Sequence, residues 1–148
     1  MKTAILAWSV LLAIAAPVFA ALGEGEETVS ADQAKFRAAK TSVSERGTFR
    51  LHEASRGDGS LIREYVNPQG KVFAVSWRGP VMPDLSQLLG SNFAAFHEKL
   101  QFKTSRRRIA TVQEGDLVVE STGHARGFYG RAYLMSMLPA GVTEAMIQ

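Results

Sequence analysis

The chain has 148 residues and a formal net charge of +3 at pH 7, and 46% of its residues are hydrophobic. This length and composition are typical of one globular domain that buries a sizeable core. The positive charge is too small to indicate a nucleic-acid partner. The chain contains no cysteine, which excludes disulfide bonds, so packing of the core must supply the stability.

The first twenty residues predict a secretory signal peptide. Lys2 precedes an uncharged, mostly apolar run over residues 3–16, and Val18 and Ala20 put small side chains at positions −3 and −1 of a cleavage site. A membrane anchor is disfavoured because that run is shorter than the roughly 20 residues of a bilayer span. Cleavage after Ala20 leaves one α+β domain over residues 21–148, exported to the periplasm or secreted, and its net charge falls from +3 to +2. No later segment predicts a transmembrane span.

The first half of this domain predicts one helix and three strands. Residues 21–29 contain two glycines and three glutamates and are expected to form a flexible acidic start. Ser30 and Gln33 have the spacing of a capping box, which favours a helix to about Lys40. Alternating apolar residues then predict strands in "TFRLHEA", "LIREYV" and "KVFAVSW", separated by turns at "RGDGS" and "NPQG".

The third of these strands ends in a connector to a second helix. In the strand, Phe73, Val75 and Trp77 are expected to share one face. The connector "RGPVMPD" ends with Asp84, which with Gln87 has the spacing of a helix start. Leucines and phenylalanines then recur at spacings of mostly three and four, which predicts an amphipathic helix over residues 84–99 with Gly90 as its weak point.

The second half repeats this rhythm. Strands are predicted in "RIATV", "LVVEST" and "FYGRAYL", followed by a tail with a short helical turn beyond Pro139. The fold class is therefore α+β, with short antiparallel meanders, two main helices and the order α-βββ-α-βββ. A shift of 56 positions aligns Trp77 with Tyr133 and Leu61 with Leu117, which suggests an internal repeat or the coincidence of two alternating patterns.

The sequence contains no recognisable catalytic or metal-binding constellation. Its three histidines are His52, His97 and His124, and no serine lies in a G-x-S-x-G motif. His97-Glu98 lacks the second histidine of an H-E-x-x-H zinc motif. No catalytic residue, metal ligand or cofactor is therefore predicted. The basic residues Lys103 and Arg106–Arg108 leave open a peripheral association with anionic lipid, although such a run is more often a solvated loop.

The candidate binding residues are Trp77, Arg78, His124, Arg126 and Tyr129. Aromatic residues that alternate along strands usually belong to the core, but they can also line a groove. The polar members of this set lie at strand ends and turns, where binding residues tend to gather. We expect a binding site at these positions if Trp77 and Tyr129 border an open groove.

Three stretches resemble a family of exported bacterial proteins, domain of unknown function 2844. They are "REYVNPQGKVFAVSWRGPVMPDLSQLLG", "GDLVVESTGHARGFYGRAYL" and "LPAGV", and the resemblance they carry spans most of the predicted mature chain. The resemblance implies an exported bacterial protein. It implies no activity, cofactor or functional residue.

Two functions follow as hypotheses. The first is a non-catalytic accessory or binding module of the cell envelope, which would present a sheet face or strand edge to a protein or polymer. The second is a small enzyme acting on an envelope polymer or metabolite, with His124, Arg126 and nearby carboxylates converging in a pocket. The absence of a reactive motif favours the first.

Overall fold

The computed structural model describes residues 22–102, 109–124 and 126–148. Its α-helices are α1 (Val29–Phe36), α2 (Leu85–Leu89) and α3 (Phe93–Phe102). Its strands are β1 (Lys40–Glu45), β2 (Arg50–Ser55), β3 (Leu61–Val66), β4 (Val72–Gly79), β5 (Ile109–Glu114), β6 (Leu117–His124) and β7 (Gly127–Leu134). Short 3-10 turns lie at Glu26–Thr28, Gly90–Asn92, Met135–Met137 and Glu144–Met146.

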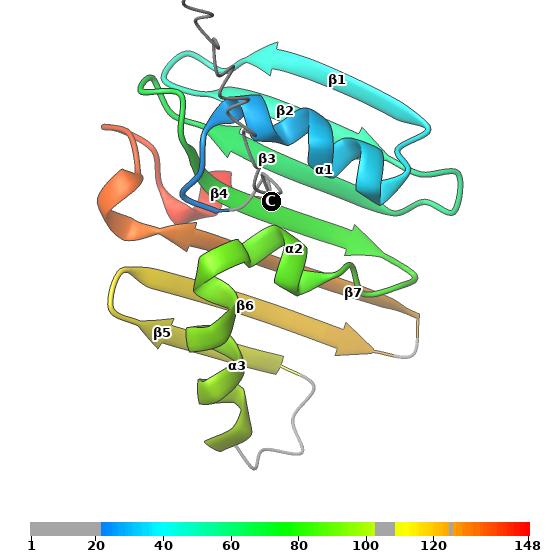
Figure 1. Ribbon diagram of the computed structural model, residues 1–148, viewed down its shortest axis with the longest axis vertical. Coiled ribbons are helices and arrows are strands. Elements are labelled where there is room, and N and C mark those ends of the chain that lie inside the picture. The colour runs from blue at the N-terminus through cyan, green and yellow to red at the C-terminus, as the bar shows by residue number, and fades with distance from the viewer. Residues whose placement is uncertain (1–21, 103–108, 125) are drawn as a thin grey trace, which may run out of the picture.

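The strands form one antiparallel sheet with the order β1-β2-β3-β4-β7-β6-β5. The three helices lie on one face of this sheet, with α1 over the β2–β3 side and α3 over the β5–β6 side (Figure 1). The two halves of the chain meet where β4 pairs with β7, from Ala74 opposite Tyr133 to Gly79 opposite Phe128. The α+β class and the antiparallel meanders are therefore confirmed, and both halves contribute to one continuous sheet.

The sheet has an apolar layer on each face. The helix-side core holds the side chains that the helices cover, among them Ile62, Val75, Trp77, Leu89 and Phe96. The tail-side core lies on the opposite face, where the C-terminal segment packs; its buried members are Leu51, Tyr65, Phe73, Ala74, Val118, Tyr133 and Ile147. Alternate residues of a strand therefore face either the helices or the C-terminal segment, except at an irregularity in the pairing of β3 with β4, where Phe73 and Ala74 both face the C-terminal segment.

The prediction extends the first helix too far and misses the strand that follows it. Helix α1 ends at Phe36, where Arg37 adopts left-handed backbone angles (φ 56°) that stop the helix. The next residues form β1, which pairs with β2, so the first half has four strands rather than three. The sequence "KTSVSE" is almost entirely exposed, and a polar edge strand lacks the alternation that predicts strands. The predicted capping box is also wrong, because Ser30 lies inside α1.

The predicted second helix is confirmed at its start and divided in its middle. Asp84 is the N-cap of α2, and its Oδ1 accepts hydrogen bonds from the amides of Ser86 and Gln87. Gly90, with φ 52° and ψ −124°, ends α2 and begins the 3-10 turn that leads into α3. The expected weak point is thus a break between two helices. Any residue other than glycine would be strained at this backbone conformation.

Phe73 and Trp77 lie on opposite faces of the sheet, whereas the alternating pattern predicts that they share one face. An irregularity between Tyr65 and Val66 shifts the β3–β4 register, so Phe73 lies in the tail-side core while Trp77 lies in the helix-side core. The prediction that they share a face is wrong because one extra residue reverses the alternation. The alignment of the two halves at a shift of 56 positions is affected in the same way, because it matches Trp77 of the helix-side core with Tyr133 of the tail-side core. The structure therefore does not support that repeat.

Both ends of the described domain are bound to the sheet. The start expected to be flexible is fixed from residue 22 onward, because the amide of Leu22 donates to the Leu88 carbonyl and that of Gly23 to the Val72 carbonyl. At the other end, the turn predicted beyond Pro139 forms at Glu144–Met146. In the part of the chain that is described, no helix has the length and hydrophobicity of a membrane span.

Candidate functional site

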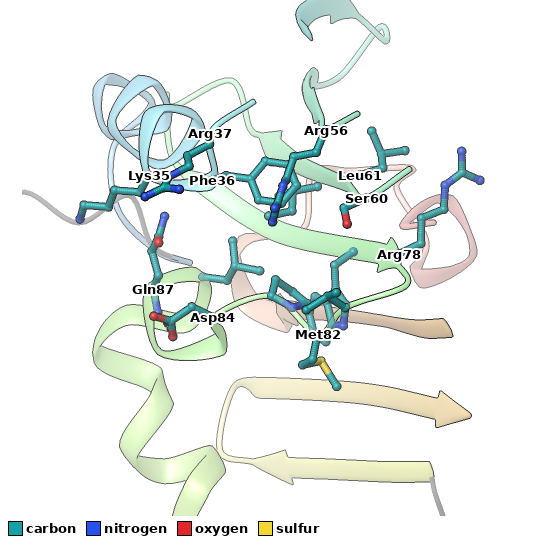
Figure 2. Close-up of a pocket in the computed structure, with 15 residues that line it drawn as sticks. Lys35, Phe36, Arg37, Arg56, Ser60, Leu61, Arg78, Met82, Asp84 and Gln87 are labelled. Carbon is teal, nitrogen blue, oxygen red and sulfur yellow. Dashed lines mark hydrogen bonds between the residues drawn. The ribbon is translucent and has the colours of Figure 1, made fainter. Parts of the chain in front are cut away.

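The connector between β4 and α2 lines a cavity on the helix side of the sheet. This helix-side pocket has a volume of about 370 Å³. It opens between the end of α1, the β2–β3 turn, the end of β4 and the start of α2 (Figure 2). Its lining residues are Lys35, Phe36, Arg37, Arg56, Ser60, Leu61, Ile62, Trp77, Arg78, Val81, Met82, Pro83, Asp84, Gln87 and Leu88. A volume in this range is typical of sites for small molecules.

The floor of the pocket is apolar and rigid. Ile62, Trp77 and Leu88 belong to the helix-side core, and Trp77 is only 3% exposed. The indole of Trp77 lies over Gly130 of β7, where a Cβ atom would come within 2.2 Å of the ring. The absence of a side chain at Gly130 therefore leaves the space that the indole occupies. The connector contributes Val81, which is 59% exposed at the rim.

Positive charge predominates around the pocket. Four of the lining residues are cationic, namely Lys35, Arg37, Arg56 and Arg78. The guanidinium carbon of Arg56 lies 5.5 Å from the centroid of the Phe36 ring, a cation–π distance. Arg56 reaches over Phe36 into the pocket, whereas Lys35 and Arg78 point away from it at opposite ends (Figure 2). Arg56 is thus the cation best placed to meet a ligand inside.

The only carboxylate among the described lining residues is already engaged. Asp84 caps α2, and its Oδ1 also accepts a hydrogen bond of 2.5 Å from the Ser86 hydroxyl. The Ser86 hydroxyl, together with the amides of Ser86 and Gln87, holds the pKa of Asp84 below its ordinary value. Asp84 therefore stays ionised at neutral pH, and its charge is directed at the first turn of α2.

Two buried polar groups in the lining have no hydrogen-bond partner among the described residues. They are the indole N–H of Trp77 and the hydroxyl of Ser60, whose residues are 3% and 4% exposed. A Cβ atom on Gly79 would lie 2.7 Å from the Ser60 Oγ, so the absent side chain lets the β2–β3 turn approach β4 closely. A buried donor without a partner is costly, and such groups in a pocket wall often meet a ligand.

A buried carboxyl group lies behind the pocket. Glu64 of β3 is 2% exposed, and its Oε1 has no partner among the described residues. Burial, reinforced by the nearby charge of Asp32, raises the pKa of Glu64 to about 8. Asp32 of α1 accepts a hydrogen bond of 2.9 Å from the side-chain amide of Gln87, which lines the pocket. Glu64 is therefore mostly protonated at neutral pH.

The opposite face of the sheet carries a smaller recess, of about 300 Å³. Together with the C-terminal segment, the lining of this tail-side recess includes Arg63, Ser76, Trp77, Arg78, Tyr129 and Arg131. The Gln148 carbonyl oxygen closes one side of it, accepting hydrogen bonds from Arg63 (2.7 Å), Ser76 (2.8 Å) and Tyr65 (2.9 Å). The polar groups on this face are therefore largely satisfied by the protein itself.

The structure brings three of the five predicted binding residues together. Trp77, Arg78 and Tyr129 all line the tail-side recess, where Tyr129 is 50% exposed and pairs with Arg78 across the strands. Trp77 and Arg78 also line the helix-side pocket. Arg126 is exposed in the β6–β7 turn and lines neither cavity. The backbone of His124 pairs with Gly127, and its side chain lies outside the described residues. The basic run at residues 103–108 also lies outside them.

Three important pocket residues were not predicted. Lys35 comes from α1. Arg56 and Ser60 come from the β2–β3 turn, and the pairing of β3 with β4 brings that turn to Trp77. The one sequence signal was the turn "RGDGS", whose glycines and aspartate are explained by backbone geometry. Within the described ranges, no three His, Asp or Glu side chains lie close enough to bind a metal ion.

Comparison with known protein families matches residues 18–147 to a family described as "Protein of unknown function (DUF2844)". The match confirms the family that the quoted stretches resemble. Neither the curated proteins nor the solved structures gave a match. The family description names no activity.

Proposed function

The chain belongs to DUF2844, a family of proteins of unknown function, and we propose that it is an exported, non-catalytic binding protein that takes a small molecule into the helix-side pocket. The observation that carries the proposal is the pairing of an open cavity with buried donors that lack partners. A cavity of about 370 Å³ on a rigid floor can enclose a ligand, and the Trp77 N–H and Ser60 hydroxyl gain hydrogen bonds when it does.

The non-catalytic role rests on the chemistry of the lining. General acid–base catalysis needs a group that can exchange a proton at the reacting atom. Among the described lining residues the only carboxyl is Asp84, which is committed to the cap of α2, and the remaining charged groups are three arginines and one lysine. Such a set is suited to binding and orienting a molecule rather than to transforming it.

Export rests on the amino-terminal pattern and on where the family match begins. The match starts at residue 18, so it includes only the last three residues of the predicted signal peptide. We expect the protein made by a secreting bacterial host to begin at Ala21. Mass spectrometry of the intact protein recovered from the periplasm or the medium measures this directly. A mature protein that retains residues 1–20 would contradict export by cleavage.

Blocking the pocket should remove the bound molecule. Val81 lies at the rim and is 59% exposed, so Val81→Trp is expected to fold normally while its indole fills the mouth of the cavity. We expect a small molecule to copurify with the wild-type protein. The amount of it bound per protein should fall about tenfold in Val81→Trp. The measurement is mass spectrometry of the compounds released when the exported proteins are denatured.

Val43→Trp is the matched control, because Val43 is 58% exposed on β1 and outside the pocket. It should retain the same compounds as the wild type. The proposal fails if all three proteins release identical sets of small molecules, whatever the charge of those molecules.

A further inference from the structure

We infer that the ligand of the helix-side pocket is a free organic anion with an apolar body, whose anionic group binds Arg56 near the Ser60 hydroxyl. This inference rests on the proposed binding function and adds the chemical class of the ligand. Three properties of the pocket lead to it: the sign of its charge, the kind of hydrogen-bonding group that it leaves unsatisfied, and the apolar character of its floor.

The charge of the lining selects against cations. Four cationic side chains line the pocket against one carboxylate, and that carboxylate is bound to the amides of α2. A cationic ligand would be repelled by the net positive charge of the lining, whereas an anion would be attracted by it. Arg56 can form a paired hydrogen bond with a carboxylate or similar oxyanion because its guanidinium presents several N–H groups in one plane.

The position of Arg56 is held by two neighbours that leave part of its guanidinium available. The Phe36 ring supports one face, and Asp58 lies 3.4 Å from Nη2 in a partly exposed ion pair. Asp58 is itself turned toward Ser60, whose amide donates to Asp58 Oδ1 at 2.9 Å. A partly exposed pair of this kind is weak. An anion that enters the pocket can therefore bind Arg56 without displacing a strong internal contact.

The buried groups without partners can both act as donors. The Trp77 N–H can only donate. The amide and hydroxyl of Ser60 hold the pKa of Asp58 below its ordinary value, so this hydroxyl already lies toward an acceptor oxygen and can donate to one on a ligand. Acceptor-rich groups such as carboxylates satisfy donors of this type. The ammonium group of an amine ligand would offer further donors to the Trp77 N–H and would leave it unsatisfied.

The floor requires an apolar body on the same ligand. Phe36, Ile62, Trp77, Met82 and Leu88 present hydrocarbon, ring and thioether surface to the cavity. Covering this surface removes it from water, which contributes about 25 cal/mol per Å² of apolar area. A small inorganic anion would leave the floor uncovered. The ligand class is therefore an organic anion rather than phosphate or sulfate.

Three probes that share one alkyl chain separate charge from hydrophobicity: octanoate, octanol and octylamine. Trp77 is the only tryptophan among the described residues, so its fluorescence in the protein from residue 21 onward reports on the pocket. We expect octanoate to change the fluorescence saturably, octanol to bind about tenfold more weakly, and octylamine to give no saturable change. Vesicles of anionic phosphatidylglycerol should also give no saturable change.

The variant Arg56→Gln isolates the anchoring charge. It should weaken octanoate about tenfold and leave octanol unaffected, because the alcohol does not use the guanidinium. Arg46→Gln is the matched control, since Arg46 is an exposed arginine in the β1–β2 turn and outside the pocket. It should bind octanoate like the wild type.

The inference is overturned if octylamine or octanol binds as tightly as octanoate, if Arg56→Gln has no effect, or if none of the three probes binds. Saturable binding to the vesicles would overturn the assignment of a free molecule and indicate a lipid headgroup instead. These outcomes differ from failure of the proposed function, which is judged by the copurified compounds of Val81→Trp and does not depend on their charge.

Discussion

Gly130→Ala is expected to destabilise the protein by about 3 kcal/mol or more. A Cβ atom on Gly130 would lie 2.2 Å and 2.5 Å from two atoms of the Trp77 indole and 2.7 Å from the Glu120 carbonyl oxygen. The indole cannot retreat because the helix-side core encloses it, and the carbonyl belongs to the neighbouring strand β6. Urea denaturation followed by circular dichroism gives the free energy of unfolding.

Gly57→Ala is the matched control. A Cβ atom at Gly57 meets no atom within 4 Å, and Gly57 does not have a positive φ. Its free energy of unfolding should therefore stay within about 0.5 kcal/mol of the wild type or rise slightly. A double variant with Trp77→Leu should recover part of the loss at Gly130, since the smaller side chain removes the ring. Equal stabilities of Gly130→Ala and Gly57→Ala would show that the indole does not lie where the structure puts it.

The second large effect concerns the pH dependence of stability, which Glu64 should dominate. Its pKa rises from 4.5 to about 8 on folding because the folded state buries it beside Asp32. The folded state thus binds this proton more tightly than the unfolded state. The stability that this bound proton contributes is fully present below about pH 4.5. It decreases as the pH rises toward about 8 and is lost above that pH. The loss is on the order of 3 kcal/mol at pH 7.

Glu64→Gln tests this directly, because glutamine keeps the size of the side chain and cannot ionise. The free energy of unfolding of Glu64→Gln relative to wild type should increase between pH 5 and pH 8 by a few kcal/mol. The control Glu45→Gln, on the exposed strand β1, should show no such increase. A constant difference across this range would mean that Glu64 is not buried as a neutral acid.

Local signals predicted local structure well, and the rest needed tertiary contacts. The start of α2 was found because Asp84 bonds to amides only two and three residues away. The break at Gly90 was found because glycine weakens any helix interior. Strand β1 was missed because an exposed edge strand is stabilised by its partner β2 and not by an apolar pattern of its own. The face that Phe73 occupies depends on the register of β3 against β4, and the sequence of one strand does not determine that register.

The site was predicted in part for the same reason. Trp77 and Arg78 lie beside a recognisable connector, so their part of the pocket could be anticipated. Arg56 and Ser60 join them from a turn that looked purely geometric, because strand pairing brings Leu61 opposite Arg78. Tyr129 was grouped with Trp77 as an aromatic strand residue, and both line the tail-side recess, but Tyr129 pairs with Arg78 and the Trp77 side chain belongs to the helix-side core. Burial of the Glu64 carboxyl is likewise set by the helix that covers it.

The place of β4 in the sheet order has a consequence for the newly made chain. Synthesis proceeds from the amino terminus, so the β2–β3–β4 meander is complete while the partner strand β7 is still about fifty residues away. During that interval β4, whose residues Val72–Trp77 are all buried in the finished protein, presents an open row of backbone donors and acceptors. An exposed hydrophobic edge strand readily pairs with strands of other chains, which leads to aggregation. A nascent chain that has passed residue 102 but not residue 134 is therefore the species most in need of a chaperone.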